Sequence, residues 1–152
     1  MKKKITAMIF ALFLCLCAVT SAFAANSDGF VGECNRLNDA ANLLTDSEEA
    51  ELLAKLDETS LRQQMDVAVA TVTNLGNCDT AAECADEVYE FSGFGYGQSK
   101  DGLMLLISAE ERDWAISTCG YGITAFTDAG IEYIGRQMKS DLSDGNYASA
   151  FN

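Results

Sequence analysis

The stretch DGLMLLISAEERDWAIST, residues 101–118, decides the fold. Its first half contains LMLLIS, residues 103–108, an unbroken apolar run that is typical of a strand covered on both faces. Its second half, DWAIST, alternates so that Trp114, Ile116 and Thr118 share one face. Because only the short turn AEER separates the halves, the pattern predicts a β-hairpin.

Two helices are predicted upstream from their start signals. Thr45 and Glu48 have the spacing of a capping box, in which each side chain satisfies a free backbone amide of the first helical turn. Thr80 and Glu83 repeat this spacing, and the helix that they begin is expected to end at Gly93.

The remaining segments complete the expected layers. VAVATV, residues 67–72, is a second fully apolar run and predicts another buried strand. A third long helix is expected to start near residue 127, followed by a turn and the opening of a fourth helix. Buried strands alternating with helices predict the α/β class, a three-layer α/β/α sandwich around a small mixed central sheet.

The first 24 residues predict a signal peptide. Three lysines precede an apolar run over residues 5–19, and Ala-Phe-Ala at residues 22–24 is a small-residue cleavage site. An uncleaved membrane anchor is the competing interpretation, but the run is shorter than the ~20 residues that a spanning helix needs. The protein is therefore expected to be extracytoplasmic, either secreted or on the outer face of the cell membrane.

Composition excludes several classes of function. Without the signal peptide, 128 residues remain with seven basic and 23 acidic side chains, a net charge of −16. Such a chain repels nucleic acid, so no nucleic-acid partner is expected, although solubility alone explains much of the charge. The sequence has no histidine, which excludes Ser-His-Asp and Cys-His catalysis and zinc sites with imidazole ligands.

Four cysteines remain after processing. Disulfides are the natural use of cysteine in an exported chain, and four cysteines allow three pairings. We favour Cys78–Cys84, which are close in sequence near a helix start, and this leaves Cys34–Cys119. Zinc binding is disfavoured because the cysteines do not occur in the closely spaced pairs that are typical of zinc sites. Free thiols are the remaining alternative.

The glycine-rich stretch GFGYGQSKDG, residues 93–102, has the composition of a phosphate-binding loop but not its context. A P-loop or a dinucleotide-binding loop connects a strand to a following helix, whereas here a helix enters and a strand leaves. No nucleotide site is predicted. The loop does place Asp101 at the start of a buried strand, where a turn-forming Asp-Gly is the alternative explanation.

Several segments together resemble the TPM domain, a family named after a thylakoid lumen phosphatase, a photosystem II repair protein and a nematode receptor modulator. They are LNDAANLLTDSEEAELLAKLDE, MDVAVATV, KDGLMLLISAEERDWAISTCGYGI and FTDAG, and GFGYG is similar to the exported subgroup of Gram-positive bacteria. The resemblance implies three parts: the signal peptide 1–24, a lead-in segment 25–35 and a TPM-like domain 36–152. It also implies that the last helix is truncated and that a membrane anchor lies beyond residue 152.

The resemblance further implies a metal site. Asp39, Asp101 and Asp128 match positions at which the family carries acids, and these carboxylates are expected to ring one cavity that binds Ca²⁺ or Mg²⁺. Asp39 as a turn cap and Asp128 as a helix-terminus charge are the structural alternatives. The loops expected to line the cavity contribute Gly95, Tyr96, Gly97, Gly102, Gly120, Tyr121 and Gly122.

Neighbouring residues of the hairpin are assigned structural roles. Asp113 opens the second strand at the opposite end from Asp101, so we exclude it from the metal site. Arg112, beside two glutamates, is interpreted as a surface ion pair, and Trp114 as a core residue.

Two functions follow. The first is a cation-binding interaction module of envelope quality control that docks on a membrane-protein partner. The alternative is a metal-dependent acid phosphatase, in which the ion binds a phosphoester and activates water. We favour the module because Lys100 is the only basic residue near the expected site to offset phosphate charge.

Overall fold

The computed structural model describes residues 35–152, so the predicted signal peptide and Cys34 lie outside the described residues. Four strands form one sheet in the order β1 (Leu37–Asp39), β2 (Asp66–Val72), β3 (Gly102–Ser108) and β4 (Asp113–Cys119). The first three strands are parallel, and β4 pairs with β3 as the antiparallel partner of the predicted hairpin. The prediction of a small mixed sheet is confirmed.

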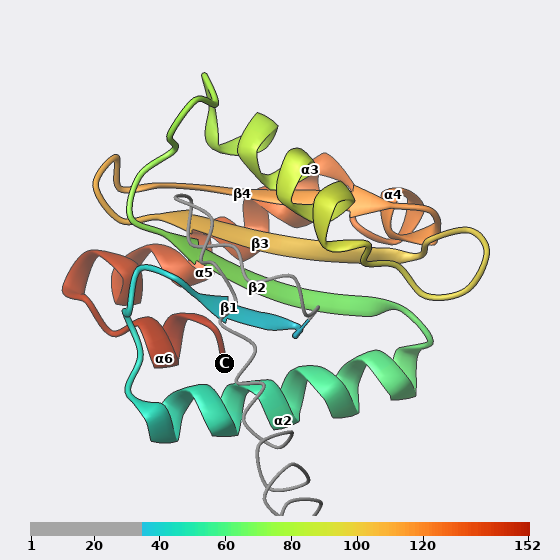
Figure 1. The fold of residues 1–152 in the computed structure, drawn as a ribbon, viewed down its shortest axis with the longest axis horizontal. Helices are drawn as coiled ribbons and strands as arrows, with labels where there is room; N and C mark the ends of the chain where they lie inside the picture. Colours follow the sequence, from blue (N-terminus) through green and yellow to red (C-terminus); the bar gives the residue numbers. More distant parts are fainter. Residues whose placement is uncertain (1–34) are drawn as a thin grey trace, which may run out of the picture.

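Helices cover both faces of the sheet (Figure 1). The face above the sheet carries α3 (Ala81–Ser92), while α2 (Asp46–Gln63) lies below. The lower face is also covered by α5 (Asp128–Asp144) and by the short α6 (Tyr147–Ala150). The architecture is therefore the predicted three-layer sandwich.

Both predicted capping signals begin helices. At α2, Thr45 Oγ1 accepts a hydrogen bond from Glu48 N at 3.4 Å, and the Glu48 carboxylate accepts one from Thr45 N at 2.8 Å. At α3, Thr80 Oγ1 accepts from Glu83 N at 3.1 Å, but the Glu83 carboxylate accepts from the amide of Asp79, one residue before the cap. The second motif is thus a shifted capping box.

Alternate residues of the central strands feed two separate cores. Ala68, Ala70, Met104 and Leu106 pack under α3, whereas Val69, Leu105 and Ile107 face α2 and α5. This division follows from the two-residue period of a strand, and it explains why these strands are apolar throughout.

Trp114 belongs to the α2–α5 core, as the sequence predicts. Its indole lies against Gly135 of α5, where an added Cβ would collide with the ring. Gly135 therefore allows this helix to approach the sheet closely.

Two short elements are absent from the sequence-based expectation. The three residues of β1 add a parallel edge strand at the start of the predicted domain, where no strand is expected, and α4 (Tyr121–Ala125) replaces part of a predicted loop. Among the described residues, no helix is long and apolar enough to cross a membrane.

Candidate functional site

The structure does not bring the three predicted metal ligands together. Asp39 ends β1, whereas Asp101 directly precedes β3, which runs parallel to β1 and β2. In the sheet register Asp39 is opposite Thr71, and Thr71 is opposite Ile107, six residues beyond Asp101. At ~3.3 Å per residue, the two acids lie about 20 Å apart along the strand direction.

Asp39 instead caps the turn that leads into α2. One carboxylate oxygen accepts a hydrogen bond from Leu44 N at 2.8 Å, and the other accepts one from the hydroxyl of Thr71. The same hydroxyl oxygen accepts a hydrogen bond from Ala41 N at 3.1 Å. Both carboxylate oxygens therefore have partners within the protein, as the turn-cap alternative requires.

Asp128 is exposed in the first turn of α5, where its charge complements the helix dipole. The preceding Thr127 supplies the cap, because its hydroxyl accepts a hydrogen bond from Gly130 N at 3.3 Å. Within residues 35–152, no three His, Cys, Asp or Glu side chains gather as a metal would require. A site formed by all three predicted acids does not fit this fold.

Asp101 lies at the centre of a different arrangement, at the end of the sheet where β3 begins. Asp101 Oδ1 accepts a hydrogen bond from Tyr121 N at 2.6 Å. Its backbone pairs with Tyr96 in both directions, at 2.9 and 3.0 Å, and its carbonyl also accepts from Asp66 N at 3.0 Å. One residue thus joins β2, the glycine-rich loop and the start of α4.

Glycines allow the two loops at this end to interlock. Gly120 has φ +57°, and an added Cβ would collide with the Asp101 carboxylate; at Gly122 it would meet the carbonyl oxygen of Gly102. At Gly102 itself a Cβ would collide with the Tyr89 hydroxyl. The loop 93–102 and the segment 120–125, which includes α4, therefore form one packed unit, the glycine-loop end, at the right of Figure 1.

Asp66 and Arg36 are the residues that sequence reasoning missed. Asp66 Oδ2 accepts a hydrogen bond from Gly95 N at 2.9 Å, and Oδ1 accepts two from Arg36, at 2.8 and 3.2 Å. Arg36 also pairs with Asp57 of α2 at 2.6 Å. The hydrogen bonds to Asp66 raise the pKa of Arg36, with a smaller contribution from Asp57, although partial burial lowers it. The only sequence signal is an acid directly before a buried strand, as at Asp101.

Lys100 and the Tyr89 hydroxyl, both at this end, make hydrogen bonds within the protein. Lys100 Nζ donates a hydrogen bond to Gly93 O at 3.3 Å, and the Tyr89 hydroxyl donates one to Lys100 O at 3.2 Å. Burial raises the pKa of Tyr89, and the neighbouring Cys119, Asp66 and Asp101 add to this shift. Tyr89 is therefore a neutral structural donor, and Lys100 closes its own loop rather than facing a ligand.

Several large apolar side chains are exposed in the segments that meet at this end of the sheet. Tyr121 and Ile123 are each 63 % exposed, and Tyr96 is 38 % exposed. Phe91, in the last turn of α3 before the glycine-rich loop, is 71 % exposed. We call these four residues the loop-end patch. Single exposed apolar residues are common, but several of them in neighbouring segments are typical of an interaction surface.

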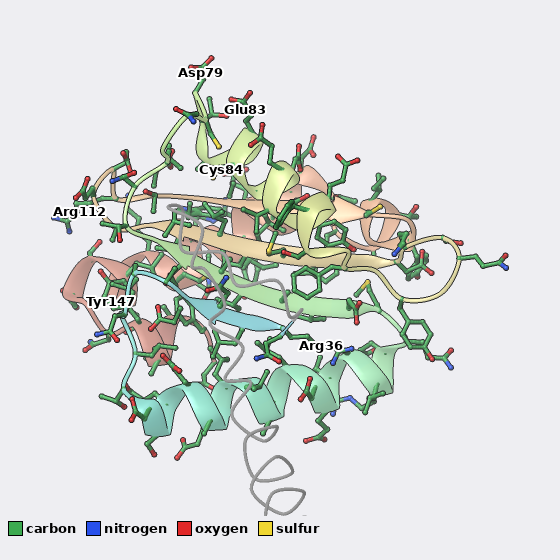
Figure 2. All side chains as sticks on the ribbon, in the orientation of Figure 1. Arg36, Asp79, Glu83, Cys84, Arg112 and Tyr147 are labelled. Carbon is green, nitrogen blue, oxygen red and sulfur yellow. The ribbon has the colours of Figure 1, made fainter. Side chains whose placement is uncertain are left out.

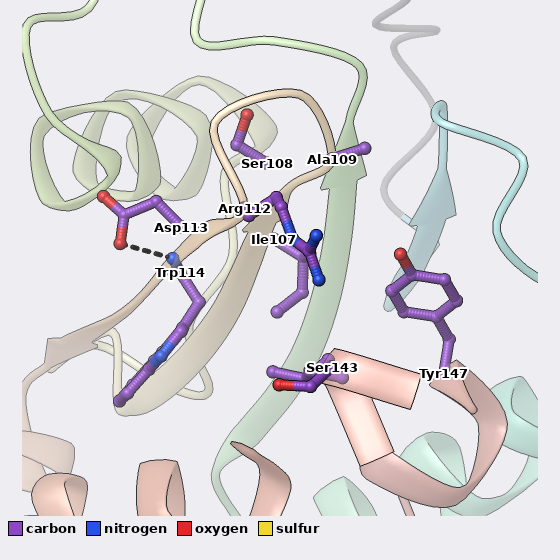
Figure 3. Close-up of a pocket in the computed structure, with 9 residues that line it drawn as sticks. Ile107, Ser108, Ala109, Arg112, Asp113, Trp114, Ser143 and Tyr147 are labelled. Carbon is purple, nitrogen blue, oxygen red and sulfur yellow. Dashed lines mark hydrogen bonds between the residues drawn. The ribbon is translucent and has the colours of Figure 1, made fainter. Parts of the chain in front are cut away.

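The opposite end of the sheet has a small hollow beneath the β3–β4 turn (Figure 3). It is lined by residues that include Arg112, Trp114 and Tyr147, and its volume of about 70 Å³ is far below the ~300 Å³ of small-ligand pockets. The predicted surface ion pair of Arg112 is wrong: among the described residues, Arg112 pairs with no acid. The carboxylates of Glu110 and Glu111 instead accept hydrogen bonds from Asn74 and Ser108.

Comparison with protein families identifies the fold. Residues 37–152 match the TPM domain. The chain belongs to the TPM domain family. The sequence-based resemblance is therefore confirmed, while the exported Gram-positive subgroup stays a prediction.

Three solved structures share the fold. The N-terminal domain of a P. gingivalis protein has 22 % identity and a TM-score of 0.66, over 77 % of this chain and 74 % of that one. The N-terminal domain of cg2496 from Corynebacterium glutamicum has 18 % identity and a TM-score of 0.58, over 87 % and 82 %. BA42 from Bizionia argentinensis has 15 % identity and a TM-score of 0.59, over 71 % and 73 %. No curated protein matches the chain.

Proposed function

We propose that this TPM domain is an extracytoplasmic interaction module that docks on a membrane-protein partner through its glycine-loop end. The observation that carries the proposal is the loop-end patch. Its residues come from three segments, and the contacts of Asp101 with Tyr96 and Tyr121 hold two of those segments together. A surface that is already ordered loses little conformational entropy when it binds, which favours affinity.

The oxygen atoms near Asp101 support a weak cation site within this surface. A Cβ at Gly120 would approach both Asp101 Oδ1 and the carbonyl oxygen of Ser99, so these oxygens lie beside the same glycine. Ca²⁺ takes six to eight oxygen ligands, and water would have to supply most of them here. We propose that the ion binds with a dissociation constant of about 10⁻⁴–10⁻³ M, as in extracellular modules.

The cation is tested by thermal unfolding of the mature chain in Ca²⁺ or Mg²⁺, beside Asp101→Asn. At tenfold excess over the dissociation constant, binding stabilises the folded state by about 1.4 kcal/mol. NaCl at equal ionic strength is the control for screening of this acidic protein. No response beyond that of NaCl, or an equal response in Asp101→Asn, would remove the ion from the proposal.

Docking is tested by copurification from envelope extracts, with Tyr121→Ser/Ile123→Ser as the patch variant. Leu61→Ser is the matched control, because Leu61 is 68 % exposed on α2, which covers the other face. We expect a membrane protein to be recovered with the wild type and the control but not with the patch variant. Recovery that does not depend on the patch would contradict the proposal.

The alternative, a metal-dependent acid phosphatase, rests on the family resemblance. It would need the ion, water and phosphoester at one site, and the separation of Asp39 from Asp101 removes the predicted ligand set. Ca²⁺- or Mg²⁺-dependent phosphate release from a generic phosphoester, lost in Asp101→Asn, would favour this alternative over the module.

A further inference from the structure

Two cysteines meet at the start of α3, away from the glycine-loop end. Cys78 lies in the connection from β2 to α3, and Cys84 lies in the first turn and a half of the helix. Both pack in the core cluster under α3, where Cys84 is buried and Cys78 is half-buried. In the described part of the chain, Cys78, Cys84 and Cys119 are thiols.

The connection folds back over the helix face that carries Cys84. Cys78 Sγ lies 3.7 Å from the carboxylate of Glu87, which is one helical turn beyond Cys84. The amide of Asp79 is held by the Glu83 carboxylate at 2.7 Å, and Thr80 caps the helix. Figure 2 shows Asp79, Glu83 and Cys84 together at one end of α3. These contacts place the Cys78 thiol beside that of Cys84.

Cys119 does not compete for this position. It ends β4 opposite Gly102, at the glycine-loop end, and it lies near Tyr89, five residues beyond Cys84 along α3. Five residues correspond to about 7.5 Å of helix. The geometry therefore favours Cys78 as the partner of Cys84.

We propose that Cys78 and Cys84 form a disulfide that fixes the β2–α3 connection to the first turns of α3. The oxidant is a disulfide compound, such as oxidised glutathione. The half-buried Cys78, as a thiolate, attacks this disulfide, forms a mixed disulfide and releases one thiolate. Cys84 then loses its proton and displaces the second thiol from Cys78. The two cysteines lose two protons and two electrons, and the oxidant becomes two thiols.

The surroundings favour a structural bond over a catalytic one. Burial raises the pKa of Cys78 to about 12, and the adjacent Cys84 and Glu87 add to the shift. The protonated thiol reacts slowly, because the thiolate is the attacking species. Once the bond has formed, the buried Cys84 sulfur is shielded from external thiols, so the disulfide is expected to resist exchange.

Mass spectrometry of the exported chain tests the pairing directly. No Lys or Arg lies between residues 63 and 100, so trypsin leaves both cysteines in one peptide. We expect that peptide to be two hydrogen atoms lighter and inert to alkylation without reductant. An acid-specific protease cuts after Asp79 and Glu83, and should then yield two fragments joined only by the disulfide. Cys119→Ser should leave this result unchanged.

Thermal unfolding with and without a dithiol reductant is the second measurement. Loss of a short disulfide loop is expected to lower Tm by roughly 5–10 °C. Cys78→Ser/Cys84→Ser should show no response to reductant. Full alkylation of both cysteines after exposure to excess oxidised glutathione at alkaline pH would overturn the proposal, as would a linked peptide that joins either one to Cys34 or Cys119.

Discussion

At the residue scale, the glycines of the two loops are contact residues rather than a phosphate cradle. Gly120 combines a left-handed φ of +57° with contact to the Asp101 carboxylate, and Gly122 meets the backbone of Gly102. Each glycine removes a side chain where two backbone segments approach. The glycine-rich composition therefore reflects packing between loops, which a comparison with nucleotide motifs does not predict.

Gly120→Ala is expected to destabilise the domain by about 2–4 kcal/mol, because it adds a collision to the left-handed strain. Gly145→Ala is the control for a positive φ alone, since Gly145 has φ +76° and ψ 15° with open space around its α-carbon. The control should cost only about 1 kcal/mol. Urea denaturation measures both values, and equal losses would show that the contact with Asp101 contributes nothing.

Asp39→Ala is expected to destabilise the domain by about 1–3 kcal/mol, because it leaves the Leu44 amide and the Thr71 hydroxyl without their acceptor. The same variant should keep any Ca²⁺-dependent rise in Tm, since Asp39 lies at the far end of the sheet from Asp101. Loss of the calcium response without loss of stability would return Asp39 to the metal site.

At the element scale, the strongest local signals were sufficient to predict the long helices and the three longer strands. Capping-box spacings predict the starts of α2 and α3, and continuous apolar runs predict β2 and β3. The three-residue β1 is too short to show a period, and α4 has only five residues.

Missing β1 also explains the failure of the metal-site geometry. Because β1 runs parallel to β3, an acid that ends β1 and an acid that precedes β3 lie at opposite ends of the sheet along the strand direction. Asp66 and Arg36 were missed because their pairing depends on three-dimensional contact between segments 30 residues apart.

Thr45→Ala should destabilise α2 by about 1 kcal/mol at pH 7, because it removes the cap. Hydrogen bonds from the Thr45 amide and hydroxyl lower the pKa of Glu48. The stabilisation linked to Glu48 is therefore present above its ordinary pKa of 4.5 and is lost as the pH falls through the lower folded-state value. We expect the stability difference between wild type and variant to shrink between pH 6 and pH 3. A difference that stays constant with pH would exclude this contribution.

At the scale of the whole molecule, charge sets the response to salt. The chain carries ten basic and 23 acidic side chains, and this excess of like charge opposes compaction. Raising NaCl from about 20 to 500 mM shortens the Debye length from roughly 20 Å to 4 Å. Tm should therefore rise by a few degrees, as differential scanning calorimetry can measure. A fall in Tm would show that ion pairs such as Arg36–Asp66 outweigh the general repulsion.

The packing of the two glycine-containing segments determines which residues at this end can be substituted without loss of stability. Their mutual fit depends on glycine backbone and on Asp101, whereas Tyr96 and Tyr121 point their bulk outward between the glycines. Substitution at the two tyrosines can alter chemical identity at the tip without disturbing its scaffold. The residues that hold the loops together are thus different from the residues that are exposed for binding. New binding preferences could arise there through single side-chain replacements.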